Sequence, residues 1–254
     1  MAHFAITVKN KSAKDHHYFL FVDAPKVAYA NGDEDNQVFT NVFMSSSKVA
    51  KDHGTVRFNI KKEFYAVCGT NPTSDLATGV QVTTNDWRAV KLAQDEEKGS
   101  ALIMDGSPGD SAIFLGEPKL TCPRKGAFSV QPKNFNAGNG GEPDLCIEGS
   151  IVQPFYFRIS SAWSTARQFI GLGAQSPGGE DDIIPVATVL ASPNTTAFII
   201  PKNTYSIAWG TYAPGTIIDV ATVSEACTID FSGRSETAAI IVHNADGTWT
   251  KTLQ

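Results

Sequence analysis

The residues of this chain that could do chemistry are aromatic rings placed close to imidazole or guanidinium groups. Trp163 and Arg167 share one polar stretch, and His16 and His17 are adjacent in another. A tryptophan face can stack on a flat or unsaturated ligand while a nearby cationic group hydrogen-bonds its oxygens. We therefore expect a small-molecule site in which Arg167 and His17 are catalytic groups. Trp163 and His16 would then contact the substrate.

Two further groups have the same character. Trp209 and Tyr212 flank a Gly-Thr pair at the end of an expected strand, and Trp87 directly precedes Arg88. We expect Tyr212 to be a third catalytic donor, and Trp209, Trp87 and Arg88 to bind the substrate. The alternative is that each Trp fills the core of its own sandwich, with each Arg lying over it at the surface.

Motifs for other chemistries are missing from the sequence. It contains no G-x-G-x-x-G or G-x-x-x-x-G-K-[ST] phosphate loop and no G-x-S-x-G nucleophile elbow. The neighbours His16 and His17 would point to opposite faces of a strand, which hinders shared metal binding. The acidic loops at 33–35 and 179–182 could hold Ca²⁺, although solvated loops explain them more simply. We expect neither a metal nor a cofactor.

Composition limits the partners and the compartment. The formal net charge of −5 argues against nucleic acid and against an anionic membrane as partners. No stretch approaches the roughly 20 apolar residues of a membrane span, and the N-terminus lacks a signal-peptide pattern. These features predict a soluble, cytoplasmic protein, in which Cys122 and Cys146 could pair but are more simply free thiols. Association of two copies as a homodimer stays open.

Short strand-like runs, rather than helical periodicity, recur along the chain. They are rich in Val, Ile, Phe, Tyr and Thr and are bounded by Gly, Pro, Asn, Asp and Ser, which is typical of antiparallel sandwiches. Residues 4–8 alternate as a strand with one buried face should. Asp246-Gly247 is a hairpin signal. The expected strands lie at 4–8, 18–22, 38–44, 55–60, 64–68, 79–83, 87–92, 101–104, 113–115, 154–159, 168–172, 184–190, 196–200, 205–208, 216–220, 226–231, 238–242 and 248–253.

Several of these runs occur twice, in the same order. The run Tyr-Ala-Val-Cys-Gly-Thr at 65–70 resembles Tyr-Ser-Ile-Ala-Trp-Gly-Thr at 205–211. Further matches join 4–8 with 155–159, 18–21 with 169–172, 42–44 with 188–190, and 101–104 with 239–242. The pattern predicts two diverged copies of one β unit.

The fold class that follows is all-β, with two tandem antiparallel β-sandwich domains related by internal duplication. The N-terminal sandwich would cover residues 1–117 and the C-terminal sandwich residues 151–254. Residues 118–150, rich in Gly, Asn and Pro, would connect them and could add strands of their own. The expected ligand site lies in the cleft between the two sandwiches.

The opening of the chain resembles a known kind of protein. Residues 6–12 (Ile-Thr-Val-Lys-Asn-Lys-Ser), followed by Tyr-Phe-Leu-Phe at 18–21 and Ala24-Pro25, are similar to the start of small fungal proteins. Some of these are encoded beside biosynthetic genes and act as cofactor-free cyclases, including hetero-Diels–Alderases. The resemblance covers about the first quarter of the chain and carries over no catalytic residue. It implies a secondary-metabolism enzyme with an apolar, polyketide-like or terpenoid-like ligand.

Three functions remain open. The first is a cofactor-independent cyclase or isomerase, including pericyclic reactions such as the hetero-Diels–Alder reaction, because holding reactants in a near-attack geometry needs no cofactor. The second is a lectin-like carbohydrate-binding module, since exposed tryptophans stack on sugars. The third is a structural or storage protein without a ligand site. We favour the enzyme, because one loop carries Trp163 and Arg167 while its counterpart carries His16 and His17.

Overall fold

The computed structural model describes residues 3–32, 37–71, 76–106, 111–133, 168–179, 182–192, 195–223 and 225–254. These residues form strands β1 to β19 and no helix, so the predicted all-β class is confirmed. Within these ranges there is accordingly no helix that could cross a lipid bilayer.

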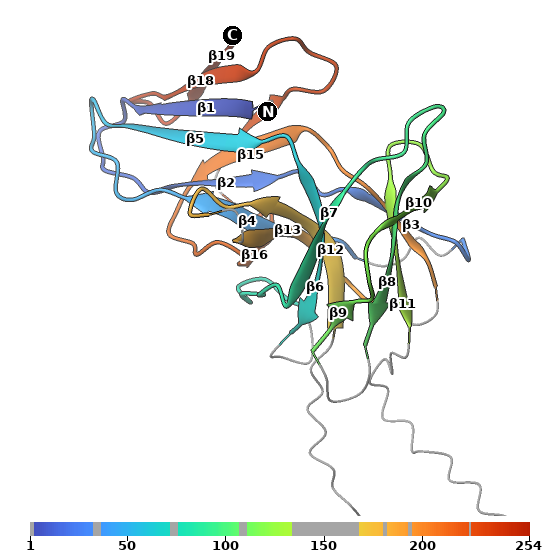
Figure 1. Ribbon diagram of the computed structural model, residues 1–254. Coiled ribbons are helices and arrows are strands. Elements are labelled where there is room, and N and C mark those ends of the chain that lie inside the picture. The colour runs from blue at the N-terminus through green and yellow to red at the C-terminus, as the bar shows by residue number, and fades with distance from the viewer. Residues whose placement is uncertain are drawn as a thin grey trace, which may run out of the picture.

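The first and last strands of the chain meet in a four-stranded sheet (Figure 1). In order, it consists of β19 (Trp249–Leu253), β18 (Ala238–His243), β1 (His3–Asn10) and β5 (Thr55–Lys61). β1 is one of the two inner strands, and it runs parallel to β18 and antiparallel to β5. Its residues Phe4, Ile6 and Val8 are buried, as the period of two predicts.

A nine-stranded sheet forms the middle of the molecule and carries most of the strand-end residues discussed below. Across the sheet, the order is β17 (Cys227–Asp230), β15 (Thr204–Trp209), β2 (Tyr18–Val22), β4 (Phe39–Ser45), β13 (Ile183–Leu190), β12 (Gln168–Gln175), β6 (Phe64–Thr70) and β7 (Asp86–Val90). The short strand β16 (Ile217–Ile218) pairs with β4.

A six-stranded sheet lies on the other side of the molecule from the four-stranded sheet (Figure 1). Its order is β10 (Lys119–Cys122), β8 (Gly99–Asp105), β11 (Phe128–Lys133), β14 (Ala197–Ile200) and β3 (Lys26–Tyr29), with β9 (Ile113–Phe114) paired to β8. All three sheets contribute to one core. Ile6 from the four-stranded sheet, Leu20 from the nine-stranded sheet and Phe128 from the six-stranded sheet belong to the same buried cluster.

Each sheet combines strands from both halves of the chain. β1 pairs with β18, β2 with β15, β6 with β12, and β3 with β14. The described residues therefore do not divide into separately paired sandwiches at 117 and 151. Within the predicted connection, β10 and β11 are strands of the six-stranded sheet. The domain boundaries at 117 and 151 remain a prediction that rests only on the sequence repeat.

The order of strands in the nine-stranded sheet mirrors itself about the contact of β4 with β13. β2 lies between β4 and β15 on one side, and β12 lies between β13 and β6 on the other. The register follows the sequence repeat, since Phe19 pairs with Ala208 while their counterparts Ile170 and Cys68 also pair. The other two sheets resemble each other in their pairing. β1 is parallel to β18 and antiparallel to β5, and β11 is parallel to β8 and antiparallel to β14.

The expected strand at 154–159 lies outside the described residues, and elsewhere the expected and observed strands differ most at three places. β3 and β10 were not expected, and both are four-residue strands in the six-stranded sheet. The expected strand at 79–83 is instead a turn segment, in which Gly79 has a φ of 87° and Gln81 makes one isolated bridge to Thr216. Short runs like these receive their hydrogen bonds from distant strands, so local pattern alone predicts them poorly.

Gly171 tests the close packing of β12 between β13 and β6. A Cβ atom on Gly171 would collide with the Ala187 backbone carbonyl of β13. We expect Gly171→Ala to lower the free energy of unfolding by about 1–3 kcal/mol, because the ladder would have to move apart. The measurement is chemical denaturation. Gly179→Ala is the matched control, since no atom lies within 4 Å of its added Cβ; equal stability of the two variants would contradict this packing.

Candidate functional site

The loop between β1 and β2 is ordered by one buried asparagine. Asn10 is fully buried, and its Nδ2 donates to the carbonyl oxygens of Lys14 at 2.9 Å and Val49 at 3.1 Å. Its Oδ1 accepts hydrogen bonds from the backbone N of Ser12 at 3.0 Å and from its Oγ at 2.7 Å. Because both polar atoms of the Asn10 amide are hydrogen-bonded, they hold the backbone of this loop in one conformation.

The same loop is fastened to the loop that follows β4. The backbone N of His16 donates to the Val49 carbonyl at 3.1 Å, and the Val49 N donates back at 2.8 Å. Asp15 accepts a hydrogen bond from the Lys51 N at 2.9 Å and forms an ion pair with Lys48 at 2.9 Å. These contacts set the direction in which the His16 side chain leaves the backbone.

The His16 ring lies in an aromatic group that we call the His16 cluster, made of His16, Tyr18, Trp209, His243 and Trp249. The His16 ring centre is 4.9 Å from that of His243, 5.1 Å from Trp209 and 5.9 Å from Tyr18. Strand ends bring these residues together. Tyr18 at the start of β2 pairs with Trp209 at the end of β15, and His243 at the end of β18 pairs with Trp249 at the start of β19.

A buried hydrogen bond joins the two strands at the centre of the cluster. The Tyr18 hydroxyl lies 3.0 Å from His243 Nδ1, and both side chains are buried. The His243 ring stacks on Trp249 with ring centres 4.4 Å apart, and Trp249 Nε1 donates to the Glu225 carbonyl at 2.8 Å. Leaving either polar group unpaired here would cost about 1–3 kcal/mol, so the pair is held together.

Burial and nearby charge make both imidazoles weakly basic. The pKa of His16 is lowered by desolvation and then by the Lys14 charge, with Asp15 opposing the shift. The pKa of His243 is lowered by desolvation and then by His16. Burial raises the pKa of Tyr18, which stays a phenol. At neutral pH the cluster therefore offers uncharged imidazole nitrogens, and His16 is the more exposed of the two.

Two further residues expected at the site, His17 and Tyr212, lie near the same strand ends and make other contacts. His17 Nδ1 is 3.3 Å from the Ser46 carbonyl, and the His17 carbonyl accepts a hydrogen bond from Gly210 at 2.9 Å. The Tyr212 ring packs edge-on against Phe19 at 4.8 Å. Trp209 is 43% exposed and Tyr212 is 39% exposed. Trp209 lies against His16 on the Tyr18 side of β2, whereas Tyr212 packs on Phe19, whose side chain belongs to the core on the other face of the strand.

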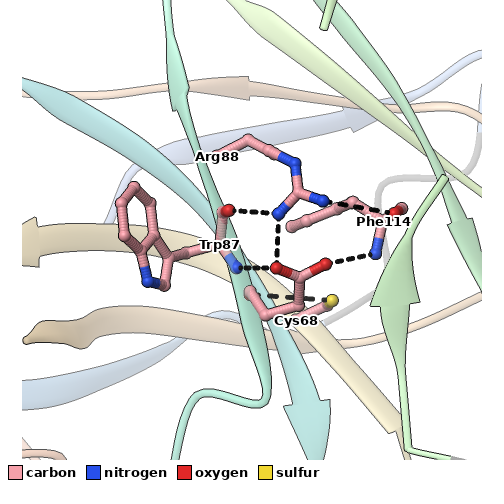
Figure 2. Close-up of polar contacts among 5 residues, drawn as sticks. Cys68, Trp87, Arg88 and Phe114 are labelled. Atoms are coloured by element: carbon pink, nitrogen blue, oxygen red, sulfur yellow. Dashed lines mark hydrogen bonds and ion pairs between the residues drawn. The ribbon is translucent and has the colours of Figure 1, made fainter. Parts of the chain in front are cut away.

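Trp87 and Arg88 lie at the opposite edge of the nine-stranded sheet, on β7. The Trp87 ring packs against Tyr65 at 5.4 Å, and the Arg88 guanidinium donates to Asp86 Oδ1 and to the Trp87 carbonyl (Figure 2). Asp86 Oδ2 accepts from the Phe114 backbone N at 2.8 Å. These hydrogen bonds join β7 to β9, so the Asp86 and Arg88 side chains have a structural role. Their substrate role remains a prediction, separate from the His16 cluster.

The other expected site residues, Trp163 and Arg167, lie outside the described residues, as do most of the acidic loop residues considered for Ca²⁺. Among the ranges that the structure describes, no three His, Cys, Asp or Glu side chains are placed to share a metal ion. Comparison with models of known protein families, with curated protein sequences and with solved structures found no match.

Sequence reasoning identified His16 and Trp209 but missed Tyr18, His243 and Trp249. Tyr18 and His243 are 225 positions apart, and each sits in an ordinary strand pattern. A signal for the loops was nevertheless present, because the tetrapeptide Ala-Lys-Asp-His occurs at both 13–16 and 50–53. The structure places these two copies side by side through the His16–Val49 bridge.

The Asp86 contacts predict a measurable structural contribution. Asp86→Ala should lower the free energy of unfolding by about 1–2 kcal/mol, because it removes the Arg88 ion pair and the acceptor of the Phe114 N–H. Denaturant titration checks this. Asp95→Ala is the control, since its pair with Lys125 is largely exposed and should contribute less. An Asp86→Ala protein as stable as the Asp95→Ala protein would show that the contacts are not stabilising.

The imidazoles predict that stability falls in acid. Their pKa values are lowered in the fold, so between these values and the ordinary value of about 6.5 the unfolded chain binds more protons. The stabilisation is complete above pH 6.5 and is lost as the pH falls below it. Denaturation between pH 7.5 and 5.5 should show this loss, and His243→Gln should reduce the slope. His53→Gln, at an exposed imidazole, should retain it; an unchanged slope in His243→Gln would refute the assignment.

Proposed function

We propose that the protein is a small-molecule enzyme of the cyclase or isomerase class that works at the His16 cluster. The observation that carries this proposal is the half-exposed His16 imidazole, kept uncharged by burial and backed by the buried Tyr18–His243 hydrogen bond. General acid–base groups are most effective when their pKa lies near the working pH, and a neutral imidazole can accept a proton there.

The surrounding rings suit an unsaturated substrate. The Trp209 face would carry the flat part of the ligand, while the His16 imidazole removes a proton or hydrogen-bonds a carbonyl whose charge grows during the reaction. The uncharged His243 behind it adds no positive charge that would oppose protonation of His16. Ring closures, including the pericyclic type to which the N-terminal resemblance points, belong to the class served by such contacts.

Internal duplication, which we also propose, supports a single specialised site. The repeat equates Tyr18 with Phe169, and Phe169 pairs with Gly69 where Tyr18 pairs with Trp209. The mirrored half therefore lacks both the phenol and the indole at the corresponding positions. We infer two copies of one β unit with exchanged strands, in which a shared frame was kept and chemistry was concentrated in one copy of the site.

A carbohydrate-binding function is the second candidate. The observation in its favour is that two aromatic rings are exposed near the end of β15, Trp209 at 43% and Tyr212 at 39%. Exposed aromatic rings stack on the apolar faces of pyranose rings, and no proton transfer is required.

Proton exchange at carbon tests the enzyme proposal. The protein would be incubated in D₂O with a panel of enolisable ketones and α,β-unsaturated carbonyl compounds, with deuterium incorporation followed by NMR. We expect at least one compound to exchange faster than in buffer, and His16→Gln to reduce that rate about 100-fold or more. His53→Gln should retain it, because the exposed His53 occupies the same tetrapeptide in the neighbouring loop.

The outcomes separate the candidates. Exchange that is equal in wild type and His16→Gln, or absent with every compound, would contradict the enzyme proposal. Binding on a glycan array that is lost in Trp209→Ala, without exchange, would favour the carbohydrate-binding function. Absence of both activities would favour a structural or storage role.

A further inference from the structure

A basic surface adjoins the His16 cluster on an otherwise acidic protein. Residues 9–17 and 47–54 contain five lysines and two aspartates, a formal charge of +3, whereas the whole chain carries −5. The lysines are exposed to solvent and lie in the two loops that meet at His16 or at the end of β1. They are Lys9, Lys11, Lys14, Lys48 and Lys51.

The fold, rather than sequence proximity, assembles this surface. The backbone N of Asn10 donates to the Gly54 carbonyl at 2.8 Å, and the His16–Val49 bridge ties the centres of the two loops together. Asp15 is occupied by Lys48 and by the Lys51 backbone N. Of the two carboxylates in these loops, Asp15 and Asp52, Asp15 is therefore already paired. The positive charges of Lys14 and Lys51 can then attract an anionic ligand.

The positive charge of this surface acts on the His16 imidazole. Lys14 precedes His16 by two residues, and its charge contributes to lowering the pKa of His16. His16 in turn lies 5.1 Å from Trp209, measured between ring centres. The Lys14 charge thus acts on the His16 imidazole, and the His16 ring contacts the solvent-facing Trp209 indole.

We propose that the ligand of the His16 cluster is a small organic anion, with a carboxylate or phosphate held by Lys14 and Lys51 and a flat unsaturated body stacked on Trp209. This inference rests on the proposed function for the location of the site, and it adds the chemical class of the substrate. An anionic group held beside His16 also orients the rest of the molecule against the imidazole, which is what a positioning contact requires.

Paired charged and neutral probes test this proposal. Titrations of the full-length protein would use trans-cinnamate and 2-naphthoate, their amides, inorganic phosphate and heparin, followed by calorimetry and by NMR shifts of the tryptophan indole N–H groups. Each carboxylate should bind at least 10-fold more tightly than its amide and should weaken as salt is raised. Lys14→Gln/Lys51→Gln should lose about 10-fold in carboxylate affinity.

Matched variants assign the effect. Lys91→Gln/Lys119→Gln removes the same number of exposed charges from positions just after β7 and in β10, and should leave affinity unchanged. Trp209→Ala should weaken the carboxylates and the amides by similar factors, because both stack on the indole.

The failures are distinguishable. Equal affinity for carboxylate and amide, with Trp209 dependence intact, overturns the anionic substrate and leaves the proposed site in place. Lysine dependence without any effect of Trp209→Ala contradicts the site itself and this inference with it. Binding of heparin alone, with no carboxylate or phosphate affinity, overturns the proposal in favour of a polyanion surface, and the absence of all binding overturns it as well.

Discussion

Pairing between strands from opposite ends of the chain is the constraint on which the rest of the structure depends. β1 lies parallel to β18, and β2 lies antiparallel to β15, so the first strands are completed by the last ones. Such pairings are slow to form and require the whole chain, because loop closure must precede the contacts that reward it. The His16 cluster exists only once both ladders are formed, since each contributes residues from its end.

Within these paired sheets, polar side chains lie in buried positions where they form hydrogen bonds with one another or with the backbone. Tyr18 and His243 are buried among apolar rings, and their mutual hydrogen bond removes the penalty of two isolated polar groups. Asn10 does the same for the loop that carries His16. Asp86 and Arg88 satisfy each other and the β9 backbone at the far edge of the sheet. The first two arrangements surround the half-buried His16 imidazole, whereas the third involves only groups of β7 and β9.

Many strands were predictable because the alternation of apolar residues and the turn residues that bound a strand are local features of the sequence. Alternation of Phe4, Ile6 and Val8 marked β1, and Asp246-Gly247 marked the turn between β18 and β19, where Gly247 has a φ of 85°. The sequence matches joined β2 with β12 and β6 with β15, and these strands hold matching places in the nine-stranded sheet, while the duplication itself stays a prediction. The sequence did not reveal that strands from the first half of the chain pair with strands from the second half, because apolar β faces are chemically alike and accept several neighbours.

For the candidate site, the sequence by itself determined which side chains could stack or exchange protons, and it singled out His16 and Trp209, whose rings the fold brings into contact. Side-chain type, alternation and turn residues are local properties, so they can be read without a fold. Tertiary structure decided the rest: Arg88 turns to Asp86, and Tyr18 meets His243 across 225 positions. Those contacts depend on which ladder each strand joins and on its register. That choice is made by the packing of the whole chain and is encoded in no single segment.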